Sequence, residues 1–332
     1  MKAEMPRFIV GESVDHYELL ALLGEGAYAE AYEARDTRSG ELVVLKLPNP
    51  ALLSEPSLFQ RYQRECEIAR RLSHPYVQGA VDDGADRSEP YLVLTYVSGR
   101  TLREVVDVDR PLPLDRALRY ADQLAQALAY LHANGVVHRD LKPENVLVDA
   151  DDNVRVGDFG TALLAGARRL TWRHLSENLG TPDYMSPEQV QGERGDQRSD
   201  VYAWGAVVYE LVTGRPPFTG DNWMAVMAAH LAKAPAPMRT LRPEAPPGLE
   251  AIVLHALRRL PEHRYASADE ILADLARLDE LGPASYDLSP EPALGGLAAA
   301  ESAARLWKLV AVIAVGFLVF AAAVVVIAVA LR

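Results

Sequence analysis

The residues best suited to chemistry lie in the middle of the chain, where positions 138–145 read His-Arg-Asp-Leu-Lys-Pro-Glu-Asn. This run places the carboxylate of Asp140 beside basic side chains, and it ends at Asn145. After a short turn and strand, Asp158 opens the sequence Asp-Phe-Gly. A carboxylate beside basic groups can accept a proton, whereas amide and carboxylate oxygens are hard ligands that suit magnesium. The pattern predicts a proton acceptor at Asp140 and a magnesium site at Asn145 and Asp158.

A glycine loop near the N-terminus reads Gly24-Glu25-Gly26-Ala27-Tyr28-Ala29 and lies between two strand-like runs. Glycine has no Cβ, so backbone N–H groups in such a loop can approach a polyphosphate. The long helix that follows the loop in a dinucleotide-binding fold is not indicated here. Taken alone, the loop could also be an ordinary hairpin turn.

A lysine, Lys46, ends the apolar strand-like run Val43-Val44-Leu45-Lys46. Taken alone, this lysine could simply extend its charge into solvent at the edge of a sheet. The helix-like stretch 58–72 carries two glutamates that could pair with it. Glu65 is the favoured partner, but the spacing does not exclude Glu67.

The elements that must position these residues change along the chain. Up to about Val97, short β-branched and apolar runs surround one helix-like stretch. After Leu112 the apolar residues recur at helical spacing, and Gly135 stands where a helix would end. The sequence therefore predicts an α+β protein with a small antiparallel β lobe containing one helix, followed by a larger, mainly helical lobe.

With these motifs in this order, the chain resembles the bacterial Hanks-type Ser/Thr protein kinases from about Tyr17 to Leu278. The resemblance extends to the run from Gly180 to Glu188, to Ser199–Gly205, and to Arg264. It implies a bilobal protein kinase domain at 17–281, with a small lobe at 17–97 and a large lobe at 98–281, preceded by an extension at 1–16.

The resemblance also implies the role of each site residue. Lys46 would hold the α- and β-phosphates of ATP, and Glu65 would orient it. Asp140 would accept or orient the proton of a Ser/Thr hydroxyl, while Lys142 would steady the γ-phosphate. Asn145 and Asp158 would hold Mg²⁺, which Mn²⁺ could replace. The nucleotide would contact Leu23, Gly24, Glu25, Gly26, Ala31, Val44, Leu94 as gatekeeper, Thr95 and Val97 in the hinge, and Leu147.

Other implied roles are structural or regulatory. Glu188 and Arg264 would form a buried ion pair, and Asp200 would brace the catalytic loop. Arg139 would pair with a phosphate on the loop 158–188, so we expect autophosphorylation there. The candidate acceptors are Thr171 and Ser176, with Thr161 also in this loop and Thr181 closer to the substrate. The alternative is that Thr171 and Ser176 are ordinary solvated loop residues.

Four positions depart from the usual kinase pattern. Thr95 replaces the usual acid of the hinge, which should matter little because the main chain binds adenine. Ala29 replaces the third glycine of the loop. Ala31 and Val44 have exchanged the sizes usual at the roof of the adenine pocket, and we interpret this exchange as conserving the total volume.

The C-terminal region has a different composition. Positions 309–331 form a 23-residue run without a charged residue, roughly 34 Å long as a helix, against a bilayer core of about 30 Å. We expect a single transmembrane helix rather than a buried core helix, joined by a Pro/Gly/Ala-rich linker at 282–308. Arg305 and Lys308 precede it, which predicts a plasma membrane protein with a cytoplasmic kinase domain and, with only Arg332 following, no extracytoplasmic sensor. A stripe of small residues could support a homodimer or be coincidence in an alanine-rich segment: Ala314, Ala321 and Ala328.

The composition excludes several classes of protein. The 332 residues carry a net charge of −12, which disfavours nucleic acid as a partner, and a single cysteine, Cys66, cannot form an intrachain disulfide. The motifs favour an active membrane-anchored kinase acting on protein substrates. The alternative is a pseudokinase that serves as a nucleotide-binding scaffold. A P-loop ATPase is excluded because no glycine loop ends in Gly-Lys-Ser/Thr.

Overall fold

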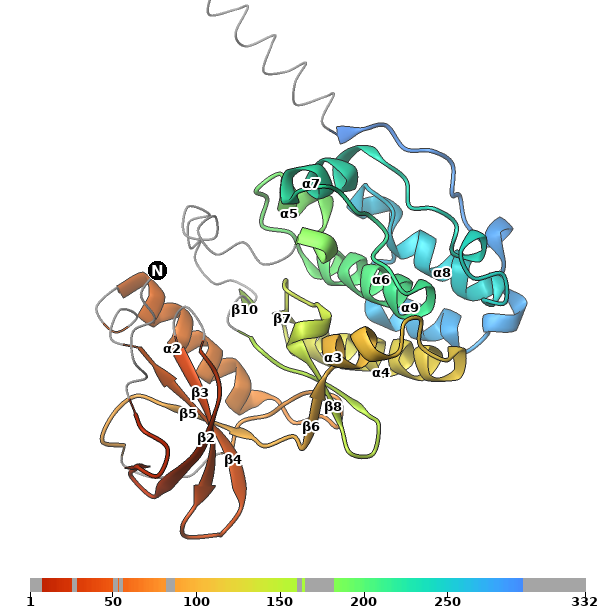
Figure 1. Cartoon of the computed structure of the whole chain (residues 1–332). Helices are drawn as coiled ribbons and strands as arrows, with labels where there is room; N and C mark the ends of the chain where they lie inside the picture. Colours follow the sequence, from red (N-terminus) through yellow and green to blue (C-terminus); the bar gives the residue numbers. More distant parts are fainter. Residues whose placement is uncertain are drawn as a thin grey trace, which may run out of the picture.

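The molecule has two lobes, and the chain passes from the small to the large lobe between residues 95 and 99 (Figure 1). The structure is a computed structural model that describes residues 8–25, 29–49, 53, 56–81, 87–159, 163–164 and 182–294. Six side chains within these ranges are outside the description: Ser57, Leu58, Arg61, Glu65, Leu163 and Leu164.

The small lobe is an antiparallel five-stranded sheet in the order β1-β2-β3-β4-β5, with helix α2 packed against it. Alternate residues of β4 point to opposite faces. Val43 and Leu45 are buried in a core on one face, whereas Val44 and Lys46 are half-buried on the other face. The elements are β1 (Ser13–Val14), β2 (Tyr17–Glu25), β3 (Ala29–Asp36), β4 (Leu42–Pro48), α2 (Pro56–Arg71) and β5 (Leu92–Thr95).

The large lobe is mainly helical, with short strand pairs where it meets the small lobe (Figure 1). Strands β6, β8 and β9 form one small sheet, and β7 pairs with β10 in another. The strands are β6 (Gly99–Thr101), β7 (Val136–Val137), β8 (Val146–Asp149), β9 (Val154–Val156) and β10 (Leu163–Leu164). The helices are α3 (Leu102–Val108), α4 (Leu114–Ala133), α5 (Pro187–Val190), α6 (Gln197–Thr213), α7 (Trp223–Ala232), α8 (Pro247–Ala256) and α9 (Ala268–Leu275). The short 3₁₀ helices are η1 (Pro143–Asn145), η3 (Pro182–Tyr184), η4 (Met238–Thr240), η5 (Pro261–His263), η6 (Leu278–Glu280) and η7 (Pro283–Ser285).

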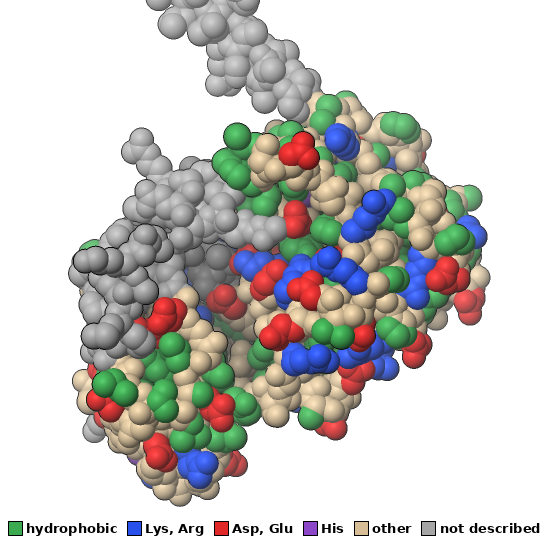
Figure 2. All heavy atoms as spheres, viewed as in Figure 1, with side chains coloured by type: hydrophobic (Ala, Val, Ile, Leu, Met, Phe, Trp, Pro, Cys, Tyr) green, Lys and Arg blue, Asp and Glu red, His purple; other side chains and the backbone are tan. Residues whose placement is uncertain are grey.

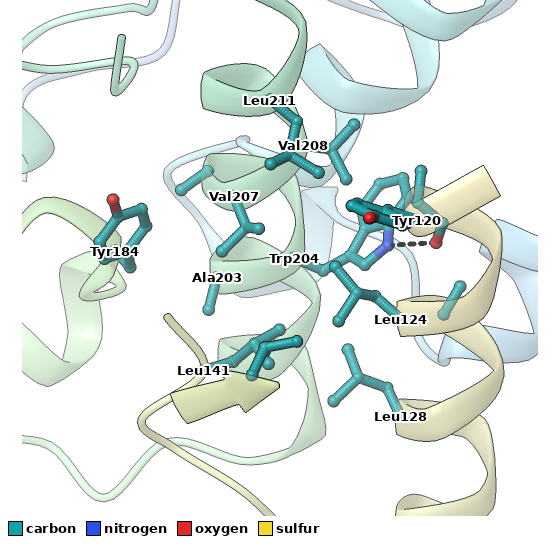
Figure 3. Packing of buried hydrophobic residues seen from close by; sticks show 14 of the residues in the cluster. Tyr120, Leu124, Leu128, Leu141, Tyr184, Ala203, Trp204, Val207, Val208 and Leu211 are labelled. Atoms are coloured by element: carbon teal, nitrogen blue, oxygen red, sulfur yellow. Dashed lines mark hydrogen bonds between the residues drawn. The ribbon is translucent and has the colours of Figure 1, made fainter. Parts of the chain in front are cut away.

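The core of the large lobe lies between α4 and α6 (Figure 3). Leu124 and Leu128 recur at helical spacing on α4 and face α6, whose residues from Ser199 to Val212 are all buried. The indole Nε1 of Trp204 donates a hydrogen bond of 2.9 Å to the carbonyl of Ala121, so the largest side chain in the core has its polar atom satisfied. This packing fixes the position of α6 next to the loop that follows β7.

Charged side chains of both signs are interspersed on the face of the large lobe shown in Figure 2. Opposite charges are also paired within the large lobe, where Arg103 contacts Glu144 at 2.9 Å and the buried Glu210 at 2.9 Å. Neighbouring opposite charges offset each other, so the acidic and basic groups on this face do not form separate patches.

The segment after the large lobe continues to pack against it beyond residue 281. The ring of Tyr286 stacks on His255, with centroids 4.3 Å apart. The carboxylate of Glu291 accepts from the backbone N–H of Arg259 at 2.5 Å and contacts His263 at 2.6 Å. The segment that we predicted to begin the linker is therefore held on α8 and η5 as far as residue 292.

The predicted two-lobed α+β fold is observed, and strand β1 adds residues before the predicted start at 17. Among the described residues, no helix combines the length and apolar character needed to cross a membrane. The predicted membrane span 309–331, linker residues 295–308 and residues 1–7 lie outside the described residues. The same holds for Gly26 of the glycine loop, for the two candidate phosphorylation sites Thr171 and Ser176, and for Thr161 and Thr181 of the same loop.

Candidate active site

Asp140 lies in the loop between β7 and η1, and two side chains hold its carboxylate. Lys142 Nζ donates to Asp140 Oδ2 at 2.8 Å, and Asn145 Nδ2 donates to the same oxygen at 3.0 Å. Asn145 Nδ2 also donates to the Asp140 carbonyl at 2.7 Å, which fixes the turn between them. Two donors on one oxygen define the direction of this carboxylate. The structure thus brings together three of the predicted site residues.

Asp200, at the start of α6, braces this loop from below. Its fully buried carboxylate accepts from the backbone N–H groups of His138 at 2.8 Å and Arg139 at 2.7 Å, and it contacts His132 Nε2 at 2.8 Å. Arg139 has a φ of 70°, a region that side-chain-bearing residues rarely adopt. The predicted brace is confirmed, and its hydrogen bonds maintain the unusual backbone next to Asp140.

His138 connects the loop to the Asp-Phe-Gly segment. Its Nε2 donates to the Gly157 carbonyl at 2.9 Å, so the other ring nitrogen, Nδ1, can accept from the Asp140 N–H at 3.3 Å. The His138 ring also makes an edge contact with Phe159, at a centroid distance of 5.6 Å. The His138 ring therefore links the loop of Asp140 to the two neighbours of Asp158 in the chain, Gly157 and Phe159.

The lysine of the small lobe reaches the carboxylate of the large lobe. Lys46 Nζ lies 3.5 Å from Asp158 Oδ1, and Lys46 is half-buried on β4. Of the two glutamates considered for Lys46, Glu67 is exposed and pairs with Arg71 at 2.5 Å. Glu65 lies on α2, but its side chain is outside the described residues, so its pairing with Lys46 stays a prediction.

Comparison with known proteins agrees with this geometry. The model of the protein kinase domain family matches residues 17–275, well over half of the chain. The chain belongs to the protein kinase family. It is 42% identical over 276 residues to the probable serine/threonine-protein kinase SCO3848 of Streptomyces coelicolor. The matched region is 82% of this chain and 40% of that relative.

Two further relatives are serine/threonine-protein kinases named PknB. The protein of Mycolicibacterium smegmatis is 39% identical over 270 residues, and that of Mycobacterium tuberculosis is 39% identical over 268 residues. Each match covers 80% of this chain and 43% of the relative. The chain therefore spans less than half the length of the curated relatives it matches, and the likeness concerns the kinase domain.

The sheet of the kinase places the predicted adenine roof on one face. In the strand register Ala31 lies opposite Lys46, and Val44 lies opposite both Glu33 and Leu94. Directly opposed residues point to the same face, so Ala31 and Val44 are diagonal neighbours on the face that carries Lys46. Leu94 is buried, Thr95 is exposed, and Val97 and Leu147 are half-buried. Leu23, Gly24 and Glu25 are exposed at the end of β2.

This register permits a test of the exchanged roof residues. Ala31→Val alone should weaken ATP binding about five-fold or more, because added volume in a packed site costs roughly 1–3 kcal/mol. Val44→Ala in the same chain should restore the affinity, as measured by calorimetric titration of all four combinations. Ala133→Val, at an exposed position on α4, serves as the control. Strictly additive effects would contradict a shared roof volume.

A divalent metal ion and ATP are used generally by this family, and the residues present fit the metal. Asn145 uses its Nδ2 on Asp140, so its Oδ1 is the atom left to face a cation. Asp158 has a half-exposed carboxylate that adds a second hard oxygen. No group of three or more His, Cys, Asp or Glu side chains suited to a metal occurs among the described residues.

One residue that contacts the predicted hinge, Gln78, was not indicated by any sequence motif. Its buried side chain donates from Nε2 to the carbonyl of Thr95 at 2.9 Å, in the predicted hinge. A lone glutamine between a helix and a strand matches no motif. The one available signal was a polar residue within an otherwise apolar stretch.

Proposed function

We propose that the protein is a membrane-tethered Ser/Thr kinase that transfers the γ-phosphate of ATP to hydroxyl groups of protein substrates and of its own activation loop. The contact of Lys46 with Asp158 across the two lobes carries this proposal, because it places a phosphate-binding lysine beside a metal-binding carboxylate. Asp140, held by Lys142 and Asn145, completes the site on the large lobe. The names of the relatives, all serine/threonine-protein kinases, support the choice of acceptor.

In this mechanism the chain positions charges. The substrate hydroxyl oxygen bonds to the γ-phosphorus as the bond from that phosphorus to the β,γ-bridging oxygen breaks, and ADP leaves. Asp140 receives the hydroxyl proton, Lys142 steadies the γ-phosphate, and Lys46 holds the α- and β-phosphates. Asn145 and Asp158 would hold Mg²⁺ or Mn²⁺, which when bound supplies positive charge toward the phosphate oxygens. Because these side chains are already held in position, less reorganisation is needed during phosphate transfer.

The surroundings of Arg139 support regulation by phosphorylation. Burial, together with the charge of Arg194, lowers the pKa of the Arg139 guanidinium to about 10. Within the described residues, no carboxylate lies within 4 Å of this guanidinium, which donates instead to the carbonyls of Arg194 and Gly195. A phosphate on Thr171 or Ser176 would supply the missing negative charge.

The tether is proposed from the apolar run 309–331, which lies outside the described residues. Its length and lack of charge are those of a single bilayer-spanning helix. We expect the full chain in the membrane fraction of expressing cells and a shortened chain of residues 1–294 outside that fraction. This result would support the anchor. A homodimer through this segment stays a prediction.

The test of the kinase function is transfer of labelled phosphate from ATP in the presence of Mg²⁺. We expect label on a generic Ser/Thr substrate and on the protein itself, with the phosphate located within residues 161–181 by mass spectrometry. The same reaction with Asp140→Asn gives the background. Transfer no greater than that background would favour the pseudokinase scaffold, whereas transfer to the substrate with none in 161–181 would contradict only the autophosphorylation.

A further inference from the structure

Gln78 is a buried polar side chain at the junction of the two lobes. It lies between α2 and β5, and 7% of it is exposed. Its side-chain Nε2 donates to the Thr95 carbonyl at 2.9 Å, and its backbone N–H donates to the Val156 carbonyl at 2.8 Å. The residue therefore joins the end of β5, where the hinge begins, to β9, the strand that leads to Asp158.

Gly157 provides the space for this side chain. A Cβ placed on Gly157 would lie 2.7 Å from Gln78 Oε1, closer than real Cβ contacts. The φ of Gly157 is outside the left-handed region, so the backbone conformation does not require glycine here. A side chain at position 157 would therefore require the Gln78 amide to move, so the two positions are coupled.

The amide of Gln78 changes what the hinge offers to a purine. The Thr95 carbonyl is an acceptor, which by itself suits the 6-amino group of adenine and opposes the 6-oxo group of guanine. Gln78 already occupies part of the accepting capacity of this carbonyl, and its Nε2 carries a second N–H that can donate to a 6-oxo group. The acceptor oxygen and the donor nitrogen lie 2.9 Å apart, so one purine edge could meet both.

We propose that Gln78 is a specificity-determining residue of the nucleotide site, which allows the protein to bind guanine as well as adenine nucleoside triphosphates. The inference rests on the proposed function for one point, the position of the purine at the hinge. It concerns binding of the base, so it can hold whether or not phosphate is transferred.

The experiment measures dissociation constants for MgATP and MgGTP by calorimetric titration of the full chain in detergent. Wild type should bind both nucleotides. Gln78→Met keeps the size of the side chain and removes the amide, so the ratio of the GTP constant to the ATP constant should rise about five-fold or more. Gln63→Met, at an exposed position of α2, is the matched control and should leave the ratio unchanged. An unchanged ratio in Gln78→Met, or a wild type that binds ATP alone or neither nucleotide, would overturn the proposal.

A second set of variants tests the coupling with Gly157. Gly157→Ala should displace the amide from the Thr95 carbonyl and raise the same ratio. In a Gln78→Val chain, where the shorter side chain leaves room, Gly157→Ala should have no further effect. Equal effects of Gly157→Ala in both chains would contradict the role of Gln78. Binding of both nucleotides without phosphate transfer would refute the kinase function and leave this inference standing.

Discussion

Asp140→Asn is expected to lower the rate of phosphate transfer by about 10²–10⁴-fold, the usual contribution of a positioned general base. Asparagine retains the size of the side chain and an oxygen that can accept from Lys142. It lacks the negative charge and the basicity needed to receive the hydroxyl proton. The loss should therefore fall on kcat.

ATP affinity should remain within about two-fold, because the contacts proposed for the nucleotide and the metal come from other residues. The measurement is steady-state kinetics with a Ser/Thr peptide, together with titration of MgATP. Asp151→Asn is the matched control, because Asp151 is exposed in the turn between β8 and β9. A rate within ten-fold of wild type would remove Asp140 from the mechanism.

Glu188→Ala is expected to cause the largest loss of stability, about 3–5 kcal/mol in the free energy of unfolding. Arg264 donates to both carboxylate oxygens of Glu188, at 2.8 and 2.7 Å, and Ser199 adds a third hydrogen bond at 2.7 Å. The Arg264 side chain is completely buried. Alanine would leave this guanidinium buried without its counter-charge.

Thermal unfolding should show the loss as a fall in Tm of roughly 10 °C. Glu193→Ala, at an exposed position after α5, is the matched control. Glu188→Gln should be less harmful, because the amide oxygen can still accept from Arg264. A Tm for Glu188→Ala close to that of the control would show that the ion pair adds little.

The same pair makes a prediction for pH. Burial by itself would raise the pKa of the Glu188 carboxyl, but the hydrogen bonds and charge of Arg264 outweigh it and lower the pKa below its ordinary value of 4.5. The ionised group is therefore more favoured in the folded than in the unfolded protein. The stability it contributes is complete above the ordinary value and is lost as the pH falls through the lowered pKa. The difference between wild type and Glu188→Ala should shrink in acid.

Much of this protein could be predicted because its signals are local. Helical spacing of apolar residues from Ala117 to Leu131 indicated α4, since a helix needs one apolar face wherever it packs. The residues between Asp140 and Asn145 predicted a site because short separations bring them together in any compact loop. The family was evident from such ordered motifs.

Other features depend on residues that are far apart in the chain. The spacing did not decide whether Glu65 or Glu67 pairs with Lys46. Only the packing of α2 showed that Glu67 is exposed and paired with Arg71. The composition after residue 281 indicated a free linker, yet Glu291 is held at Arg258 and His263. Buried arginines need a counter-charge, and which carboxylate supplies it depends on where the chain returns.

The sequence by itself determined the family, the order of the lobes and the residue types of the catalytic loop, because each is written in neighbouring positions. Only the tertiary structure decided that Lys46 reaches Asp158 and that Gln78 lies between Thr95 and Gly157. Such contacts join segments separated by many residues. They exist only in the folded chain, where a buried polar group such as the Gln78 amide must find a partner.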